Sequence, residues 1–68
     1  MSQIHENIKI LIDPLDDPSR RREALDNLAA LGCLEAIEAI SERARDSREH
    51  PAIRYRAVEY LRSKGIMY

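Results

Sequence analysis

The sequence contains DPSRRREALDNLAALGC at residues 17–33 and HPAIRYRAVEYLRSKGI at residues 50–66, and these two stretches decide the fold. They align without gaps at an offset of 33, and the identical pairs are Pro18/Pro51, Arg21/Arg54, Ala24/Ala57, Leu28/Leu61 and Gly32/Gly65. Each stretch begins with a residue that suits an N-cap, followed by a proline, and proline costs nothing at the first position of a helix. Each stretch also ends in a glycine, which favours the left-handed conformation that stops a helix. The pattern therefore predicts two related helices, at residues 18–31 and 51–64.

Two further helices are predicted, at about residues 2–13 and 34–46. Asp13-Pro14 ends the earlier of them, because proline disfavours helical geometry in the residue before it. The segment 46–49 reads Asp-Ser-Arg-Glu, so it is expected to be a loop that is too polar to bury. The side chains expected to face the core recur at helical spacing. They are Ile4, Ile8, Leu11, Ile12, Ala24, Leu25, Leu28, Leu31, Leu34, Ile37, Ile40, Ala44, Ile53, Ala57, Val58 and Leu61. No strand-like alternation is present, so the predicted fold is an all-α, four-helix domain.

The segment DPSRRREALDNLAALGCLEAIEAI (residues 17–40) resembles the bacterial HEAT-like repeat of the phycobilisome-lyase type. The matching positions are Asp17, Pro18, Arg21, Ala24, Leu28, Leu31, Gly32, Ala36 and Ile37. Arg20 departs from the family pattern, which has an apolar residue there, and Cys33-Leu34 replaces the usual Asp-Pro. The resemblance implies a fragment of an α-solenoid, about one and a half to two repeats long, in which helices alternate in the order B–A–B–A. It implies a role in binding or regulating a partner protein, and it does not imply lyase activity.

Composition limits what the chain can be. Its 68 residues make one domain, residues 1–68, with no Trp or Phe, so the core must be built from aliphatic side chains. The net charge of −1 gives no general attraction to nucleic acid or to an anionic membrane. The longest apolar run, Ile10-Leu11-Ile12, is far shorter than the roughly 20 residues that span a bilayer. A cytoplasmic protein without membrane contact is therefore expected.

No motif for catalysis or cofactor binding is present. The sequence lacks a glycine-rich phosphate loop and a nucleophile motif. The histidines, His5 and His50, lie far apart, and the single Cys33 excludes an internal disulfide and a cysteine zinc site. His50 is expected at an N-cap, and Cys33 as a small buried residue. We therefore expect a protein that is not an enzyme and that holds no cofactor or metal.

Several exposed side chains are candidates for contact with a partner protein or with a second copy of the chain. They are Ile10, Arg20, Arg22, Glu38, Glu42, Tyr55, Met67 and Tyr68. Ile10 and Tyr55 are expected on the side of their helices opposite the apolar face, whereas Met67 and Tyr68 form an apolar C-terminus. Glu38 and Glu42 either form an acidic stripe for a partner or belong to a solvated helix face. In the B–A–B–A order no B helix follows the last A helix, so an apolar end is expected to be covered by homodimerisation or by a larger protein.

Nucleic-acid binding through the run Arg20-Arg21-Arg22 is the alternative hypothesis. This run lies at the beginning of a predicted helix, where free backbone N–H groups also favour anions. The competing interpretation is a solvated face, with Arg21 packed along the surface between repeats because it recurs as Arg54. The net charge and the acidic residues of segment 34–46 make nucleic acid the less favoured partner.

Overall fold

The computed structural model describes residues 3–66, which form four α-helices. They are α1 (Gln3–Ile12), α2 (Pro18–Leu31), α3 (Leu34–Arg45) and α4 (Pro51–Ser63). The predicted all-α fold is confirmed, and α1, α3 and α4 each end one residue earlier than predicted. No helix in this range is long and apolar enough to cross a membrane.

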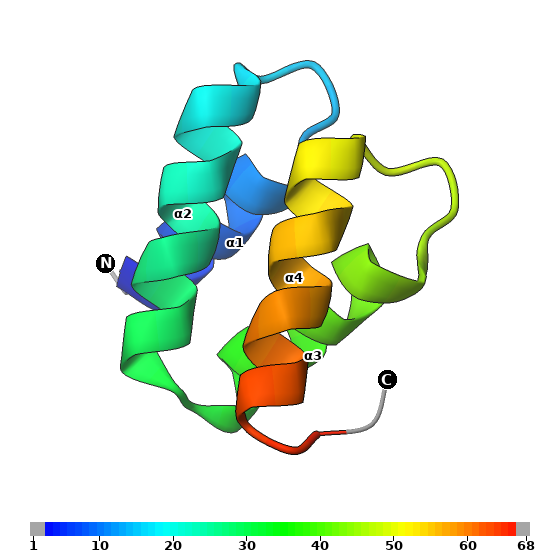
Figure 1. The fold of residues 1–68 in the computed structure, drawn as a ribbon. Coiled ribbons are helices and arrows are strands. Elements are labelled where there is room, and N and C mark those ends of the chain that lie inside the picture. The colour runs from blue at the N-terminus through cyan, green and yellow to red at the C-terminus, as the bar shows by residue number, and fades with distance from the viewer. Residues whose placement is uncertain (1–2, 67–68) are drawn as a thin grey trace.

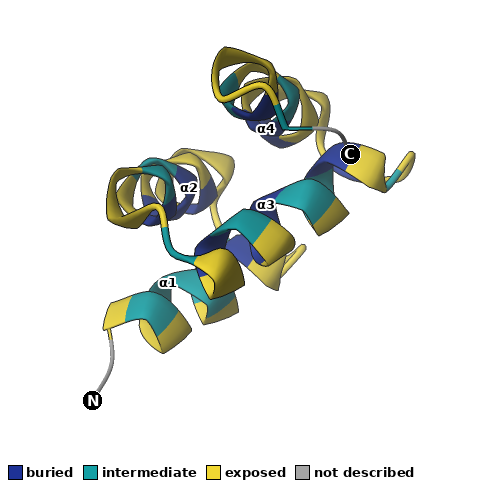
Figure 2. Cartoon of the chain, turned by 90° about the horizontal axis from the view of Figure 1, so that it is seen from below, coloured by how far each residue is buried: buried dark blue, intermediate teal, exposed yellow. Residues whose placement is uncertain are grey.

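The helices lie in two layers (Figures 1 and 2). α1 and α3 lie side by side in one layer, and α2 and α4 in the other. α1 packs most extensively against α2, and α3 packs most extensively against α4, whereas contacts between α2 and α3 are fewer. The chain therefore consists of two stacked helical hairpins. We call residues 3–33 the first hairpin and residues 34–66 the second hairpin.

The two hairpins repeat the structure of their loops at the same offset of 33. The Asp13 carboxylate accepts a hydrogen bond from the backbone N–H of Leu15, and the Asp46 carboxylate accepts one from Arg48, both at 2.9 Å. Further along each loop, a carboxylate accepts the backbone N–H of the next residue, at 2.7 Å and 2.8 Å respectively. The equivalent loop residues are Asp13/Asp46, Asp16/Glu49 and Asp17/His50. The structural equivalence thus begins before the segments whose sequences align.

The helices α2 and α4 both begin as predicted. The Asp17 carboxylate accepts the backbone N–H of Ser19 at 2.8 Å, and Nδ1 of His50 accepts that of Ala52 at 3.1 Å. These bonds satisfy backbone donors that have no partner inside the helix. His50 is therefore an N-cap residue, as predicted.

The helices α2 and α4 are also terminated by glycine, as predicted. Gly32 and Gly65 adopt φ values of 63° and 69°, a region that side chains with a Cβ seldom adopt. After Gly65, the N–H of Ile66 donates to the carbonyl of Leu61 at 2.9 Å, which is the expected Schellman arrangement. At the end of α2, the N–H of Gly32 donates to the carbonyl of Leu28 at 3.0 Å, which is the simpler left-handed ending.

The core lies between the two layers (Figure 2). The buried apolar residues are Leu11, Ala24, Leu25, Leu28, Ala36, Ala39, Ile40, Ala44, Ile53, Ala57 and Leu61. Nine of these were predicted, and Ala36 and Ala39 were not. Both unpredicted residues are small alanines of α3, a helix that contacts all three other helices. Small side chains at a buried position allow neighbouring helices to approach closely.

Three residues predicted to face the core are exposed instead. The exposed fractions are 45% for Ile12, 45% for Leu31 and 72% for Leu34. Ile12 and Leu31 are the last residues of α1 and α2, and Leu34 is the first residue of α3. Helical spacing assigns them to the apolar face, but at the helix ends this face is only partly covered.

Candidate functional site

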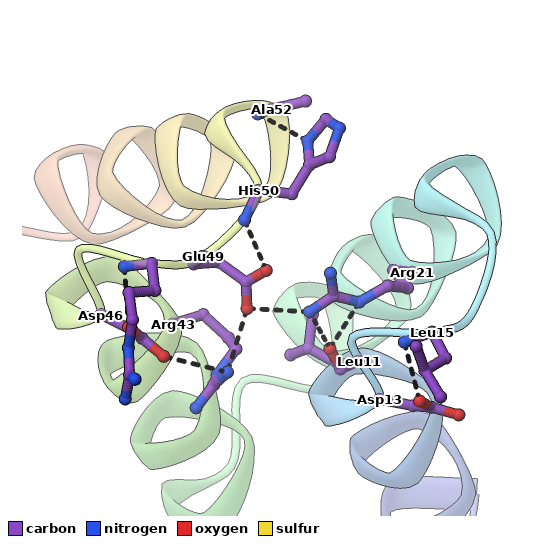
Figure 3. Close-up of polar contacts among 10 residues, drawn as sticks. Leu11, Asp13, Leu15, Arg21, Arg43, Asp46, Glu49, His50 and Ala52 are labelled. Atoms are coloured by element: carbon purple, nitrogen blue, oxygen red, sulfur yellow. Dashed lines mark hydrogen bonds and ion pairs between the residues drawn. The ribbon is translucent and has the colours of Figure 1, made fainter.

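A buried ion pair joins the two hairpins (Figure 3). The Arg21 side chain is 2% exposed, and its Nε and Nη2 donate to the carbonyl of Leu11 at 2.9 Å and 2.7 Å. The same Nη2 donates to Oε2 of Glu49 at 2.8 Å. Leu11 lies at the C-terminal end of α1, where the helix dipole favours a cation. Arg21 therefore connects the end of α1 to the loop between α3 and α4, as expected for a residue packed between repeats.

Glu49 is the acceptor at the centre of this network. Its Oε2 also accepts from Nη1 of Arg43 at 3.0 Å, and its Oε1 accepts the backbone N–H of His50 at 2.8 Å. The segment 46–49 is a loop as predicted, but the prediction that it is too polar to bury is wrong at Glu49, which is buried. A carboxylate tolerates burial when cations and donors replace its water, and here two guanidinium groups and a backbone N–H do so.

These contacts also shift the acidity of Glu49. Burial raises the pKa of the Glu49 carboxyl, while hydrogen bonds from Arg21, from the His50 backbone and from Arg43 lower it. The contacts together outweigh burial, so the pKa lies below the ordinary value of 4.5. Folding therefore favours the ionised form of this carboxyl.

Stability is expected to fall with acid in a way that depends on Glu49. A carboxyl whose pKa is lowered by folding contributes stability above its unfolded pKa, and this contribution is lost as pH falls through the folded pKa. Here the loss begins near the ordinary value of 4.5 and continues below it. Urea unfolding from about pH 7 to about pH 3 should show a steeper decline for the wild type than for Glu49→Gln, since the variant lacks this titration. Equal slopes in the two proteins would contradict a role for Glu49.

The Arg20-Arg21-Arg22 run does not form one cationic surface. Arg20 forms an exposed ion pair with Asp16 at 3.4 Å, and Arg21 is buried. Arg22 is exposed and has no ion-pair partner among residues 3–66. Residues two apart on a helix do not face each other, so Arg20 and Arg22 point to different sides of α2. The three arginines that suggested nucleic-acid binding therefore do not lie together on one surface.

The other predicted contact residues lie on different surfaces. Ile10 is half-buried against the core, so the prediction that it is exposed is wrong. It lines an open groove together with Asp16 and Arg20, because the loop after α1 and the first turn of α2 lie beside it. Glu38 and Glu42 are exposed on α3, as expected. The predicted residues Met67 and Tyr68 lie outside the described residues.

Tyr55 is exposed as predicted, with 67% of its surface accessible, and it lies beside two open grooves. An open groove of about 670 Å³ is lined by Ser47, Glu49, Pro51, Arg54, Tyr55, Val58 and Arg62. Tyr55, Val58 and Arg62 also line a second groove of about 580 Å³, which includes residues of α2. Arg54 and Arg62 have no ion-pair partner within the described part of the chain. We call the five residues Arg54, Tyr55, Val58, Glu59 and Arg62 the α4 surface.

No group of three or more His, Cys, Asp or Glu side chains among residues 3–66 is placed to hold a metal ion. His5 instead lies 3.2 Å from the carboxylate of Glu35. Cys33 precedes α3 without a side-chain capping bond, and it is half-buried against the core rather than fully buried.

Comparisons with protein-family models, with curated proteins and with solved structures find no match to the chain. The resemblance of residues 17–40 to bacterial HEAT-like repeats therefore stays a prediction. The function must be inferred from the surfaces of the two stacked hairpins themselves.

Proposed function

We propose that this chain is a small protein-interaction module without enzymatic activity, an adaptor or regulator that binds a partner protein through the α4 surface. The observation that supports this most directly is the exposed Tyr55 beside the half-buried Val58, in a groove lined by Arg54 and Arg62, which form no ion pair with residues 3–66. A cytoplasmic location and the HEAT-like type of repeat belong to the same proposal.

The composition of the α4 surface resembles that of binding hot spots. Tyrosine and arginine are enriched at the energetic centres of protein interfaces, where a rigid aromatic ring and a planar guanidinium give large contact areas. The other strongly exposed apolar side chains, Leu15 and Leu34, are not part of this groove. Single exposed apolar residues are ordinary on protein surfaces, so they carry less weight.

The acidic side of the molecule is a weaker candidate. Glu38 and Glu42 are exposed on α3, and Glu35 on the same helix contacts His5. Neither Glu38 nor Glu42 lines one of the two grooves beside Tyr55. A solvated helix face explains them without a partner.

Tyr55→Ala should weaken binding to a partner by about 30-fold or more, because an interfacial tyrosine at a hot spot contributes about 2 kcal/mol or more. The tagged chain is used to capture proteins from its native host, and the affinity of the captured protein is then measured by titration calorimetry. Glu42→Ala is the matched control, since Glu42 is also exposed but lies on α3. If binding survives Tyr55→Ala and is lost in Glu42→Ala, the partner binds the acidic face of α3 and not the α4 surface. Recovery of nucleic acid alone would overturn the proposal.

A further inference from the structure

The second hairpin is held on the first by specific charged contacts. One is the buried pair between Arg21 and Glu49. Another joins Arg56 of α4 to Asp26 of α2, with its Nε at 2.6 Å and its Nη2 at 3.0 Å from the two carboxylate oxygens. In these two contacts the first hairpin offers Arg21 and Asp26, and the second hairpin supplies their partners. An exposed contact between His5 of α1 and Glu35 of α3 also joins the hairpins.

The groups that the first hairpin offers recur on the outer face of the second hairpin. At the offset of 33, Arg54 is equivalent to Arg21, and Glu59 is equivalent to Asp26. Arg54 and Glu59 are both exposed, and neither forms an ion pair with any residue from 3 to 66. Because the capping bonds and the left-handed glycines of the two hairpins also match, the α4 surface repeats the docking face of the first hairpin, with Arg54 and Glu59 free of ion pairs to residues 3–66.

The apolar part of the docking face is repeated as well. Leu25, which is buried beneath the second hairpin, is equivalent to Val58, which is half-buried. The arginine at position 22 is replaced by Tyr55, which adds apolar area. The α4 surface therefore offers an apolar centre, Tyr55 and Val58, among two cations, Arg54 and Arg62, and one anion, Glu59.

We infer that the α4 surface binds a helical hairpin of a partner protein in the register that the second hairpin adopts on the first. This inference rests on the proposed function and adds the chemistry of the partner. The partner carries a carboxylate in the loop between its helices, which pairs with Arg54 as Glu49 pairs with Arg21. The helix that follows this loop in the partner carries a cation, as far along the chain from the carboxylate as Arg56 is from Glu49. This cation pairs with Glu59.

A second copy of this chain does not satisfy these requirements, because its second hairpin already uses Glu49 and Arg56 on its own first hairpin, which leaves only its first hairpin to dock. In the same register, the first hairpin of a second copy would place Asp16 opposite Arg54, which is favourable. It would also place Glu23 where Arg56 lies, and hence opposite Glu59, with like charges facing each other. Arg20 would occupy the position of the buried Ile53, in the apolar part of the contact. The occupant is therefore a different protein segment.

The chain's own second hairpin serves as the probe for this docking register. A test protein is made in which residues 1–66 are followed directly by another copy of residues 34–66, so that the copied Glu49 and Arg56 face Arg54 and Glu59. In the natural chain Glu35 contacts His5, and at the offset of 33 the residue equivalent to His5 is Glu38. The copied Glu35 would therefore face Glu38, so the copy carries Glu35→Lys to avoid two like charges. Unfolding by urea is then followed for the natural and extended chains, each with and without Arg54→Ala.

The expected result is a single cooperative transition in the extended chain that is sensitive to Arg54. Arg54→Ala should leave the midpoint of the natural chain unchanged, because the side chain is exposed there. In the extended chain the same substitution should raise the unfolding equilibrium constant by at least about tenfold, and a cycle with Glu49→Gln in the copy should show that the two changes are coupled. An effect of Arg54→Ala that is equally small in both chains would overturn the inference, as would separate unfolding of the copied hairpin.

Failure of this inference can be distinguished from failure of the proposed function. A captured partner that depends on Tyr55 but binds equally well to Arg54→Ala and Glu59→Ala would keep the α4 surface and overturn the register. Analytical ultracentrifugation of the natural chain tests the choice of occupant, with a monomer expected at about 100 μM, a concentration at which an interface with a Kd of 1 μM is saturated. A dimer at this concentration that dissociates in Arg54→Ala would overturn the choice of a different protein.

Discussion

Glu49→Ala is expected to destabilise the protein by about 3–5 kcal/mol, because it leaves a buried arginine without its carboxylate. The Arg21 guanidinium is 2% exposed and would keep only the carbonyl of Leu11 as an acceptor, while Arg43 would also lose its contact with Glu49. A domain of this size gains only about 3–5 kcal/mol from its core, so the variant should be largely unfolded. Circular dichroism combined with urea unfolding measures this loss.

Asp16→Ala is the matched control for this substitution. Asp16 is equivalent to Glu49, and its carboxylate likewise accepts the backbone N–H of the following residue. Its ion pair with Arg20 is exposed on the arginine side, so removing it should cost no more than about 1.5 kcal/mol. If Glu49→Ala and Asp16→Ala reduce the free energy of unfolding equally, the buried network does not hold the hairpins together.

Leu28→Ala is expected to reduce the free energy of unfolding by about 2–5 kcal/mol, through lost apolar burial and the cavity that remains. Leu28 is 0% exposed, and it lies on α2, which packs against α1, α3 and α4. No Trp or Phe is available to fill the space, so the surrounding aliphatic side chains must collapse into it or leave a void. Urea unfolding of the purified variant measures the effect.

Leu31→Ala separates burial from residue type on the same helix. Leu31 is 45% exposed, although helical spacing assigns both leucines to the apolar face. Its truncation should change the free energy of unfolding by no more than about 0.5 kcal/mol. A loss for Leu31→Ala that matches the loss for Leu28→Ala would show that the end of α2 is covered in solution.

The sequence predicted the helices well because their boundaries depend on local chemistry. Asp17 and His50 cap the helices with their own side chains, and Gly32 and Gly65 stop them through backbone conformation. None of these features needs a distant partner. The same local logic predicted the exposure of Tyr55, since one turn of α4 suffices to place it opposite the buried Ile53.

Predictions that required a neighbouring element were less successful. Glu49 lies in a polar loop, and only the approach of Arg21 from the first hairpin makes its burial favourable. Ile10 was placed on the exposed side of α1, but the following loop and the start of α2 lie beside it. In both cases the environment is set by residues that are distant in the chain or that depend on how the chain turns.

Arg21 and Arg54 show what the sequence alone does not determine. They occupy the same position in two matching helices, after equivalent caps, and by sequence they are interchangeable. The sequence by itself determined that two helices of one type would form, because capping, proline and glycine act within a few residues. Only the tertiary structure decided that Arg21 is buried against Glu49 and that Arg54 is exposed, because burial depends on what packs against each helix face.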